Sequence, residues 1–427
     1  MESYGQVLFY AIPSFTALIL LEYLWGLYKR KVTYRAMDTL SSLSSGITNV
    51  IKDVLSLTVV IISYEWVEAN FAFFEPKAVN FWWYAAGFIA IDFASYWIHR
   101  LSHEINVLWN RHIVHHSSEE FNLACALRQS ISGFLSLSIF FLFPAALLGV
   151  PGEIIAVLAP FHLFAQYWYH TQHIGKLGFL EYIIVTPSQH RVHHAINKEY
   201  LDRNYAAIFC IWDRMFGSFQ EELNDVAPVY GVKRQVKTWN PILINFQHLE
   251  LLARDSFRTK KIEDKIKVWF KPTGWRPDDV AEKYPITIVD DPYAMVKYDT
   301  PASKSLIGWT LIQMFFILGL MFYLFLNLVE IGTPNVFIYG GYLIASVFTM
   351  SVLMDRIKHA WWLEGLKSIV GLTLMWQFSG WFGIGQEFQG ANLFIGGYFI
   401  LSVLVSSAFV YFEFRTDEES AELITAT

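Results

Sequence analysis

Long apolar stretches recur along the chain and predict membrane-spanning helices. A bilayer core of about 30 Å requires roughly 20 apolar residues in a helix. The clearest stretch, residues 305–329, contains no charged residue. Comparable runs occupy residues 8–28, 54–74, 81–98, 335–354 and 392–412. We expect each of these stretches to cross the bilayer.

Three further segments are apolar but interrupted. Residues 131–150 and 154–169 are joined by Pro151-Gly152-Glu153, which is long enough only for a tight helical hairpin. Residues 361–382 form another apolar run, which contains Glu364 and Lys367. We expect these segments to enter the membrane as well.

The composition agrees with a membrane protein. Charged residues make up 16% of the chain, against about 25% in soluble globular proteins. The net charge is −6 and no long basic run occurs, which excludes a disordered, fibrous or nucleic-acid-binding protein. The two cysteines, Cys125 and Cys210, exclude a disulfide framework and a Cys-x-x-Cys zinc site. The predicted fold class is an all-α polytopic integral membrane protein.

The basic residues predict the orientation. Lys29, Arg30, Lys31 and Arg35 follow the first apolar stretch and place that loop in the cytosol. Residues 99–130, 170–304, 355–360 and the C-terminus then also face the cytosol. Of 32 Lys and Arg, only Lys77 falls in a predicted outer loop and Lys367 inside a span. The host membrane would be the endoplasmic reticulum in a eukaryote or the inner membrane in a bacterium.

The chain is predicted to divide into three parts. Residues 1–98 are membrane anchors. Residues 99–300 form a cytosolic-face catalytic domain that contains the hairpin at about 131–169. Residues 301–427 form a C-terminal transmembrane bundle with a short polar tail at 416–427. Within the second part, residues 233–283 carry 12 Lys and Arg among aromatic and aliphatic residues. This segment is either a solvated face or a surface for anionic lipid headgroups.

Histidines carry the candidate chemistry, since eleven of the 13 lie between His99 and His194. Their spacing is helical, so members of a cluster share a helix face and can point at a common metal. The clusters are His99-x3-His103, His112-x2-His115-His116 and His190-x2-His193-His194, with His170 and His173 near the end of the hairpin. Scattered structural histidines would not show three such clusters. His162 is expected to be a core histidine paired with a neighbour, and His248 and His359 receive no role.

The predicted topology places the histidine clusters at the same face of the membrane. The span 81–98 ends directly before His99, and the hairpin returns the chain to the same membrane face just before His170. Nine imidazoles are too many for one tetrahedral zinc and suit two metal ions. All-nitrogen ligation with open positions fits non-haem iron that binds O2, although zinc also binds imidazole. The sequence therefore predicts a histidine-rich di-iron domain at the cytosolic face.

Several carboxylates could support these imidazoles through their second ring nitrogen. Asp92 lies two helical turns before His99 inside a span, where a metal-bound imidazole would be a suitable partner. Glu104 lies among the clusters and could belong to the site or to the surface. Glu119 and Glu120 are interpreted as a solvated acidic pair.

The three histidine clusters resemble those of the fatty acid hydroxylase/sterol desaturase superfamily of membrane di-iron oxygenases, over about residues 80–220. A closer resemblance, to the alkylglycerol monooxygenases, covers nearly the whole chain. It rests on the runs His99-Arg-x-x-His-Glu-x-Asn106, His115-His-Ser-Ser-Glu119, Ala126-Leu-Arg-Gln-Ser130, Thr186-Pro-Ser-x-His-Arg-Val-His-His194, Asn204-Tyr-Ala206 and Ile211-Trp-Asp-x-x-Phe-Gly217.

This resemblance implies a tetrahydrobiopterin-dependent cleavage of ether lipids, in which two iron ions activate O2. Hydroxylation next to the ether oxygen would give a hemiacetal that collapses to a fatty aldehyde and a glycerol derivative. The implied metal ligands are His99, His103, His112, His115, His116, His170, His190, His193 and His194. Glu104 is the implied candidate catalytic residue, and His173 departs from the family pattern and is expected only to neighbour the site. No motif identifies the pterin pocket.

Two alternatives stay open at this point. A fatty acid, sterol or carotenoid hydroxylase or desaturase would use the same irons and draw electrons from a separate donor protein. Two cysteines exclude a fused c-type cytochrome or ferredoxin domain, but not a separate donor. A metal transporter or sensor with a His-rich loop is disfavoured by the helical ligand spacing and by the lack of polar residues in 305–329.

Overall fold

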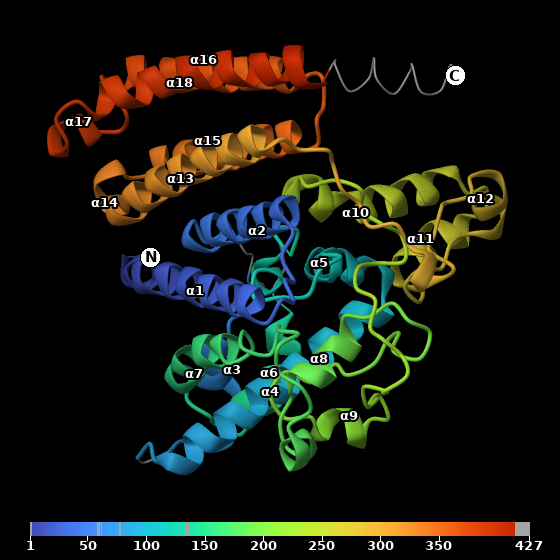
Figure 1. Cartoon of the computed structure of the whole chain (residues 1–427). Helices are drawn as coiled ribbons and strands as arrows, with labels where there is room; N and C mark the ends of the chain where they lie inside the picture. Colours follow the sequence, from blue (N-terminus) through green and yellow to red (C-terminus); the bar gives the residue numbers. More distant parts are fainter. Residues whose placement is uncertain (1, 58–59, 61, 77, 134–136, 415–427) are drawn as a thin grey trace, which may run out of the picture.

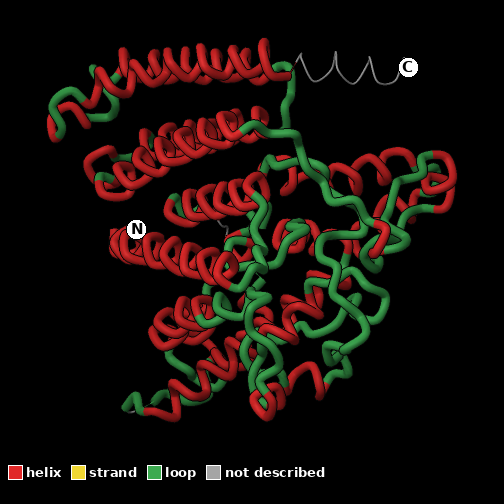
Figure 2. The backbone as a smooth tube through the Cα atoms, viewed as in Figure 1, coloured by secondary structure: helices red, strands yellow, loops and turns green. Residues whose placement is uncertain are grey.

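The protein is helical, and the described part of the chain contains no strand (Figures 1 and 2). The computed structural model describes every residue except 1, 58–59, 61, 77, 134–136 and 415–427. Lys77 and the predicted polar tail 416–427 lie outside the described residues. The all-α fold class predicted from the sequence is confirmed.

Among the described residues, four helices are long and apolar enough to cross a membrane. These segments are Tyr10–Tyr28, Lys304–Leu326, Asn335–Met354 and Ala391–Phe414. They belong to α1 (Glu2–Tyr28), α13 (Lys304–Leu326), α15 (Asn335–Met354), and α18 (Ala391–Ala408) with the π-helical turn Phe409–Phe414. They match four of the predicted spans, and the protein is an integral membrane protein.

The predicted span 54–74 is wrong, although part of it lies outside the described residues. Helix α2 (Ala36–Val54) ends where that span was expected to begin, and α3 (Tyr64–Phe71) has only eight residues. In Figure 1, α2 lies in the same stack as α1, α13 and α15. Hydropathy misses α2 because its buried Ser and Asp side chains count as polar, although hydrogen bonds satisfy several of them. Ser41 Oγ donates to Trp239 O at 2.8 Å and Ser45 Oγ to Gln129 O at 3.0 Å.

The predicted hairpin is present but shorter than expected. It consists of α6 (Ser138–Leu147) and α7 (Gly152–Phe164), with 10 and 13 residues. At 1.5 Å per residue these helices are about 15 and 20 Å long, too short to cross a bilayer. Asn245 explains part of the shortening, because its Oδ1 accepts from Ser130 Oγ and Ile131 N and holds the predicted start of the first arm out of the helix. The prediction of two full spans at 131–150 and 154–169 is therefore wrong.

Helix α4 (Phe81–Glu104) is longer than the predicted span 81–98. Asn80 caps its start, because the Asn80 side chain accepts from Trp82 N. The helix continues for six residues past the predicted span and carries His99 and His103. Helix α5 (Asn106–His116) starts almost immediately afterwards and changes the direction of the chain.

The C-terminal part contains α13, α14 (Leu328–Ile331), α15, α16 (Ala360–Gln377), α17 (Ile384–Glu387) and α18. Helix α16 takes the place of the predicted span 361–382, and its Glu364 and Lys367 side chains form a buried ion pair. One hydrophobic core joins this part to α2, since Ile47 and Ile51 pack in the same cluster as Leu343 and Phe399. The three-part division of the chain stays a prediction.

The remaining helices lie in the polar part of the chain. They are α8 (Pro187–His193), α9 (Ile211–Met215), α10 (Pro241–Arg258), α11 (Ile262–Phe270) and α12 (Asp278–Lys283). The basic segment 233–283 forms α10–α12, which Figure 1 places beside one end of the helical stack. Its role at anionic lipid headgroups also stays a prediction.

Candidate metal centre

Four segments carry the predicted ligands to one place. The end of α4 provides His99 and His103, and α5 provides three more histidines. His170 follows α7, and α8 with its C-terminal cap provides His190, His193 and His194. Asn106 anchors the start of α5, because its Nδ2 donates to Val268 O at 2.9 Å and Trp275 O at 3.0 Å.

The structure sorts the nine predicted histidines into two groups. We call His99, His103, His112, His116 and His193 the first histidine group, and His115, His170, His190 and His194 the second. Within each group, one nitrogen of every ring lies within 4.8 Å of the others. His162 and His173 belong to neither group.

Each three-histidine cluster is divided between the groups. In α5, His112 and His116 belong to the first group and His115 to the second. Around α8, His190 and His194 belong to the second group and His193 to the first. Residues four apart lie within about 40° of each other around a helix, whereas adjacent residues lie about 100° apart. The expectation that a whole cluster would point at one metal is therefore wrong, because only the i, i+4 pairs stay together.

The ring nitrogens that face one another are Nε2 atoms. In the first group, His112 Nε2 lies 2.8 Å from His99 Nε2 and 3.0 Å from His116 Nε2. In the second group, four Nε2 pairs lie close together: His115–His170 at 3.3 Å, His170–His190 at 2.9 Å, His115–His194 at 3.0 Å and His190–His194 at 3.0 Å.

Backbone carbonyls bind the opposite nitrogen of several rings. A carbonyl oxygen only accepts, so each such contact places the ring proton on Nδ1 and a lone pair on Nε2. The contacts are His99 Nδ1 to Tyr205 O at 2.7 Å, His193 Nδ1 to Arg203 O at 2.9 Å, His115 Nδ1 to Arg128 O at 3.3 Å and His170 Nδ1 to Gln166 O at 3.1 Å.

A cation fits this arrangement and a hydrogen bond does not. His115 and His170 both direct Nε2 lone pairs at each other, and two acceptors repel unless a cation lies beside them. In the first group, His103 Nε2 and His193 Nε2 are buried without a hydrogen-bond partner. The donor set is all imidazole, which suits iron, zinc and other borderline metals. Both groups therefore fit a bound metal ion.

Burial keeps these rings neutral, which is the form that binds a metal. Desolvation and the neighbouring His170 lower the pKa of His115 to about 3. Burial likewise lowers the pKa of His170 to about 3, and the pKa values of His190 and His194 lie well below the usual range. A metal ion entering the second group therefore does not have to displace protons near neutral pH.

Asp92 supports the fold near the site but does not contact the nine ligands. Its carboxylate accepts from His162 Nε2 at 2.8 Å, Ile208 N at 2.9 Å, Phe209 N at 3.0 Å and Trp212 Nε1 at 2.8 Å. The expectation that Asp92 would pair with a metal-bound imidazole is wrong, because these four donors already satisfy its oxygens. The expectation that His162 is a core histidine paired with a neighbour agrees with this contact.

The glutamates lie differently from what the sequence suggested. Glu119 and Glu120 are buried, so their interpretation as a solvated pair is wrong. Arg35 Nε donates to Glu120 at 2.6 Å, and Tyr298 N donates to Glu119 at 2.6 Å. Glu104 is exposed and accepts from Arg100 Nε at 2.8 Å, in neither histidine group. Its catalytic role stays a prediction.

Sequence reasoning missed the groups that orient the imidazoles. Most of them are backbone carbonyls, which no residue type reveals. Asp202, whose carboxylate lies 3.5 Å from His103 Nδ1, is in a turn at positive φ and has no fixed spacing to the clusters. The Asn204-Tyr-Ala206 run offered an indirect signal, because Asp213 accepts from Tyr205 N and Ala206 N and thereby holds the Tyr205 carbonyl at His99.

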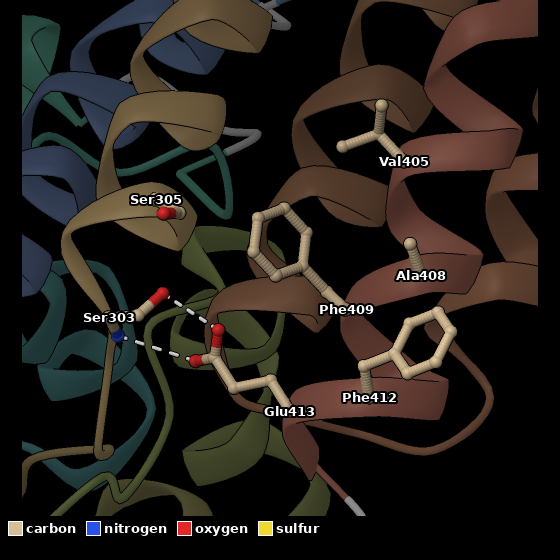
Figure 3. Close-up of a pocket in the computed structure, with 7 residues that line it drawn as sticks. All are labelled: Ser303, Ser305, Val405, Ala408, Phe409, Phe412 and Glu413. Carbon is tan, nitrogen blue, oxygen red and sulfur yellow. Dashed lines mark hydrogen bonds between the residues drawn. The ribbon is translucent and has the colours of Figure 1, made fainter.

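A separate cavity of about 550 Å³ opens between the start of α13 and the end of α18 (Figure 3). Phe409 and Phe412 form its apolar wall, and Glu413 accepts from Ser303 Oγ at 2.7 Å at its polar end. None of its lining residues is a predicted site residue.

Comparison with known proteins places the chain among lipid-modifying enzymes. Residues 84–218 match the model of the fatty acid hydroxylase family. The alkylglycerol monooxygenase of Danio rerio is 34% identical over 370 residues, which cover 85% of this chain and 81% of that protein. The Homo sapiens enzyme of the same name is 34% identical over 369 residues, with the same coverage. An ornithine lipid hydroxylase of Rhizobium tropici is 29% identical over 35% of the chain.

No solved structure matches the chain. The matched family region contains all nine clustered histidines, and the similarity to the two vertebrate enzymes extends well beyond it. The chain belongs to the alkylglycerol monooxygenase family.

Proposed function

We propose that the protein is a membrane di-iron monooxygenase that cleaves the ether bond of alkylglycerol lipids. Membership of the family makes it an oxidoreductase that uses O2 and a lipid substrate. The observation that carries the proposal is the pair of buried histidine groups, whose Nε2 lone pairs converge while backbone carbonyls bind Nδ1.

The first histidine group would hold one iron ion and the second group the other. Iron bound there would supply the activation of O2. One oxygen atom enters the C–H bond next to the ether oxygen, and the other leaves as water after taking up two electrons and two protons. The hemiacetal then breaks its C–O bond to give a fatty aldehyde and a glycerol derivative.

The chain itself supplies position and exclusion of water. The ring centroid of Tyr169 lies 4.3 Å from that of His190, and the Phe121 centroid lies 5.2 Å from that of His194. Both aromatic rings are buried, so the second group has apolar walls. An alkyl chain entering from the bilayer between the spans would bring its ether carbon to the metals while its polar head stays at the surface.

Tetrahydrobiopterin is the proposed source of the two electrons, in keeping with the resemblance seen in the sequence. The site is proposed to face the cytosol, because Lys29, Arg30 and Lys31 follow the first span. The host membrane would be the endoplasmic reticulum or, in a bacterium, the inner membrane.

The test is an assay of membranes containing the protein with an alkylglycerol, O2 and iron, with and without tetrahydrobiopterin. Fatty aldehyde that forms only with the pterin supports both the substrate class and the electron source. Protein that holds two irons and forms no aldehyde would contradict ether cleavage and favour a hydroxylase or desaturase with a separate donor. Protein that binds no metal would contradict the metal centre itself.

A further inference from the structure

Arg128 lies buried between α2 and the end of α5. Its side chain and that of Asp38 are each 2% exposed, and their charged atoms are 2.7 Å apart. We propose that Arg128 is a positioning residue for His115, and that Asp38 holds Arg128 in place for this purpose. The proposal rests on the two metal sites of the proposed function.

The Arg128 guanidinium binds three side chains at once. Nη2 donates to Asp38 Oδ1 at 2.7 Å, Nη1 to Ser117 Oγ at 2.8 Å, and Nε to Ser42 Oγ at 3.0 Å. Asp38 also accepts from Ser118 Oγ at 2.8 Å. The charge is therefore paired, and the planar guanidinium fixes the relative positions of α2 and the residues that follow α5.

The same residue contacts a proposed metal ligand through its backbone. Arg128 O accepts from His115 Nδ1 at 3.3 Å, which directs His115 Nε2 toward the second histidine group. Ser117, which the guanidinium holds, immediately follows His115 and His116. Arg128 thus holds the last turn of α5 from two sides, through its carbonyl and through its side chain.

Helix α2 holds the neighbouring residues of this segment as well. Ser45 Oγ donates to Gln129 O at 3.0 Å, and Lys52 Nζ donates to Ser130 O at 3.1 Å. Asp38, Ser42, Ser45 and Lys52 are spaced by four, three and seven residues, so they form one stripe along α2. This stripe sets the position of the Arg128 carbonyl and explains why α2 keeps polar residues in an apolar environment.

A lysine at position 128 cannot make the same set of contacts as the arginine. An ammonium group is a single point charge, so Arg128→Lys keeps the charge opposite Asp38 but cannot reach Ser42, Ser117 and Asp38 in the same geometry. Arg128→Lys keeps the backbone carbonyl that binds His115 but removes the contacts that fix its position, and disturbing a group that orients a metal-bound imidazole typically weakens metal binding 10–100-fold. Because His115 belongs only to the second group, we expect one of the two metal sites to weaken selectively.

The test uses the full-length protein in lipid nanodiscs, stripped of metal and titrated with Co(II). Its visible absorption reports ligand geometry without any catalytic reaction. Wild type is expected to bind two equivalents. Arg128→Lys is expected to bind the second equivalent at least about tenfold more weakly, with an altered spectrum, and the first equivalent normally.

Arg276→Lys is the matched control, because Arg276 forms a buried ion pair with Asp255 between α10 and the segment before α12. It makes the same chemical change away from the histidines and is expected to bind both equivalents like wild type. Arg128→Lys that binds both equivalents with the wild-type spectrum would overturn the proposal. Wild type that binds fewer than two equivalents would contradict the metal centre instead.

If Arg128→Lys does not fold, Ser42→Ala tests the proposal in its place. It removes one hydrogen bond to the guanidinium and leaves the ion pair intact. A change in the absorption spectrum of Co(II) bound at the second histidine group supports the positioning role of Arg128. A spectrum and affinities identical to wild type would reject it.

Discussion

The Nε2 atoms of His115 and His170 lie 3.3 Å apart, although each ring presents its Nδ1 to a backbone carbonyl. Both facing nitrogens therefore carry lone pairs, and the contact is stable only beside a cation. This pair also joins segments that are 55 residues apart in the sequence. It connects α5 to the segment that follows α7.

Replacing His115 or His194 with alanine should abolish aldehyde formation and lower the bound iron. Each variant removes an Nε2 from the second histidine group, while the protein should still insert into membranes. Iron content and activity of purified membranes measure the effect. His248→Gln is the control, since His248 is buried, donates from Nε2 to Asn106 O at 3.1 Å and belongs to neither histidine group. Full turnover in either alanine variant would show that the ligand assignment is wrong at that position.

His173→Ala should have a much smaller effect on iron content and activity. His173 lies three residues after His170, yet the structure leaves it outside both histidine groups. Iron per protein is compared between His173→Ala and His170→Ala. Both variants lose one histidine of the same segment, but only His170 belongs to a histidine group. Complete loss of iron in His173→Ala would mean that His173 is a ligand.

Removing the charge of Lys367 should destabilise the C-terminal bundle. Lys367 pairs with Glu364 inside the bundle, and its ammonium group lies 5.8 Å from the Tyr398 ring centroid. Lys367→Met leaves a buried carboxylate unpaired, which costs about 3–5 kcal/mol. Unfolding of the detergent-solubilised protein measures the change.

The double variant Glu364→Gln/Lys367→Met should recover most of that loss, because it removes both buried charges. Lys267→Met is a surface control, since the Lys267–Glu263 pair is exposed and should matter little. Equal stability of Lys367→Met and wild type would show that the buried pair is not needed.

His248 should make the protein sensitive to acid. Burial lowers the pKa of His248 to about 4, from about 6.5 in the unfolded chain. The neutral ring is favoured in the folded state, so its stabilisation is complete above pH 6.5 and is lost as the pH falls toward 4. Over that interval the free energy of unfolding should fall by up to about 1.4 kcal/mol per pH unit more in wild type than in His248→Gln. If the free energy of unfolding of the two proteins changed with pH in the same way, this prediction would be wrong.

Local properties of the chain could be predicted from the sequence. Residues 305–329 and 335–354 were identified as spans because hydropathy depends only on residues within one helix, and the structure has α13 and α15 there. Residues 36–54 could not be identified in this way. The side chains of Ser42 and Ser45 look polar in isolation, and their contacts with Arg128 and Gln129 in the folded protein help them to be buried.

For the candidate site, too, the sequence determined some features and the tertiary structure the others. Sequence spacing alone determined that eight of the nine histidines form clusters at ligand spacing, since an imidazole pattern of three and four residues is visible in one dimension. Only the tertiary structure decided that His115 and His116 belong to different groups, because adjacent residues point about 100° apart and the partner rings come from distant segments. It also decided that Asp92 pairs with His162 and that Arg128 lies behind His115, since hydrogen bonds across 70 and 13 residues depend on how the helices pack.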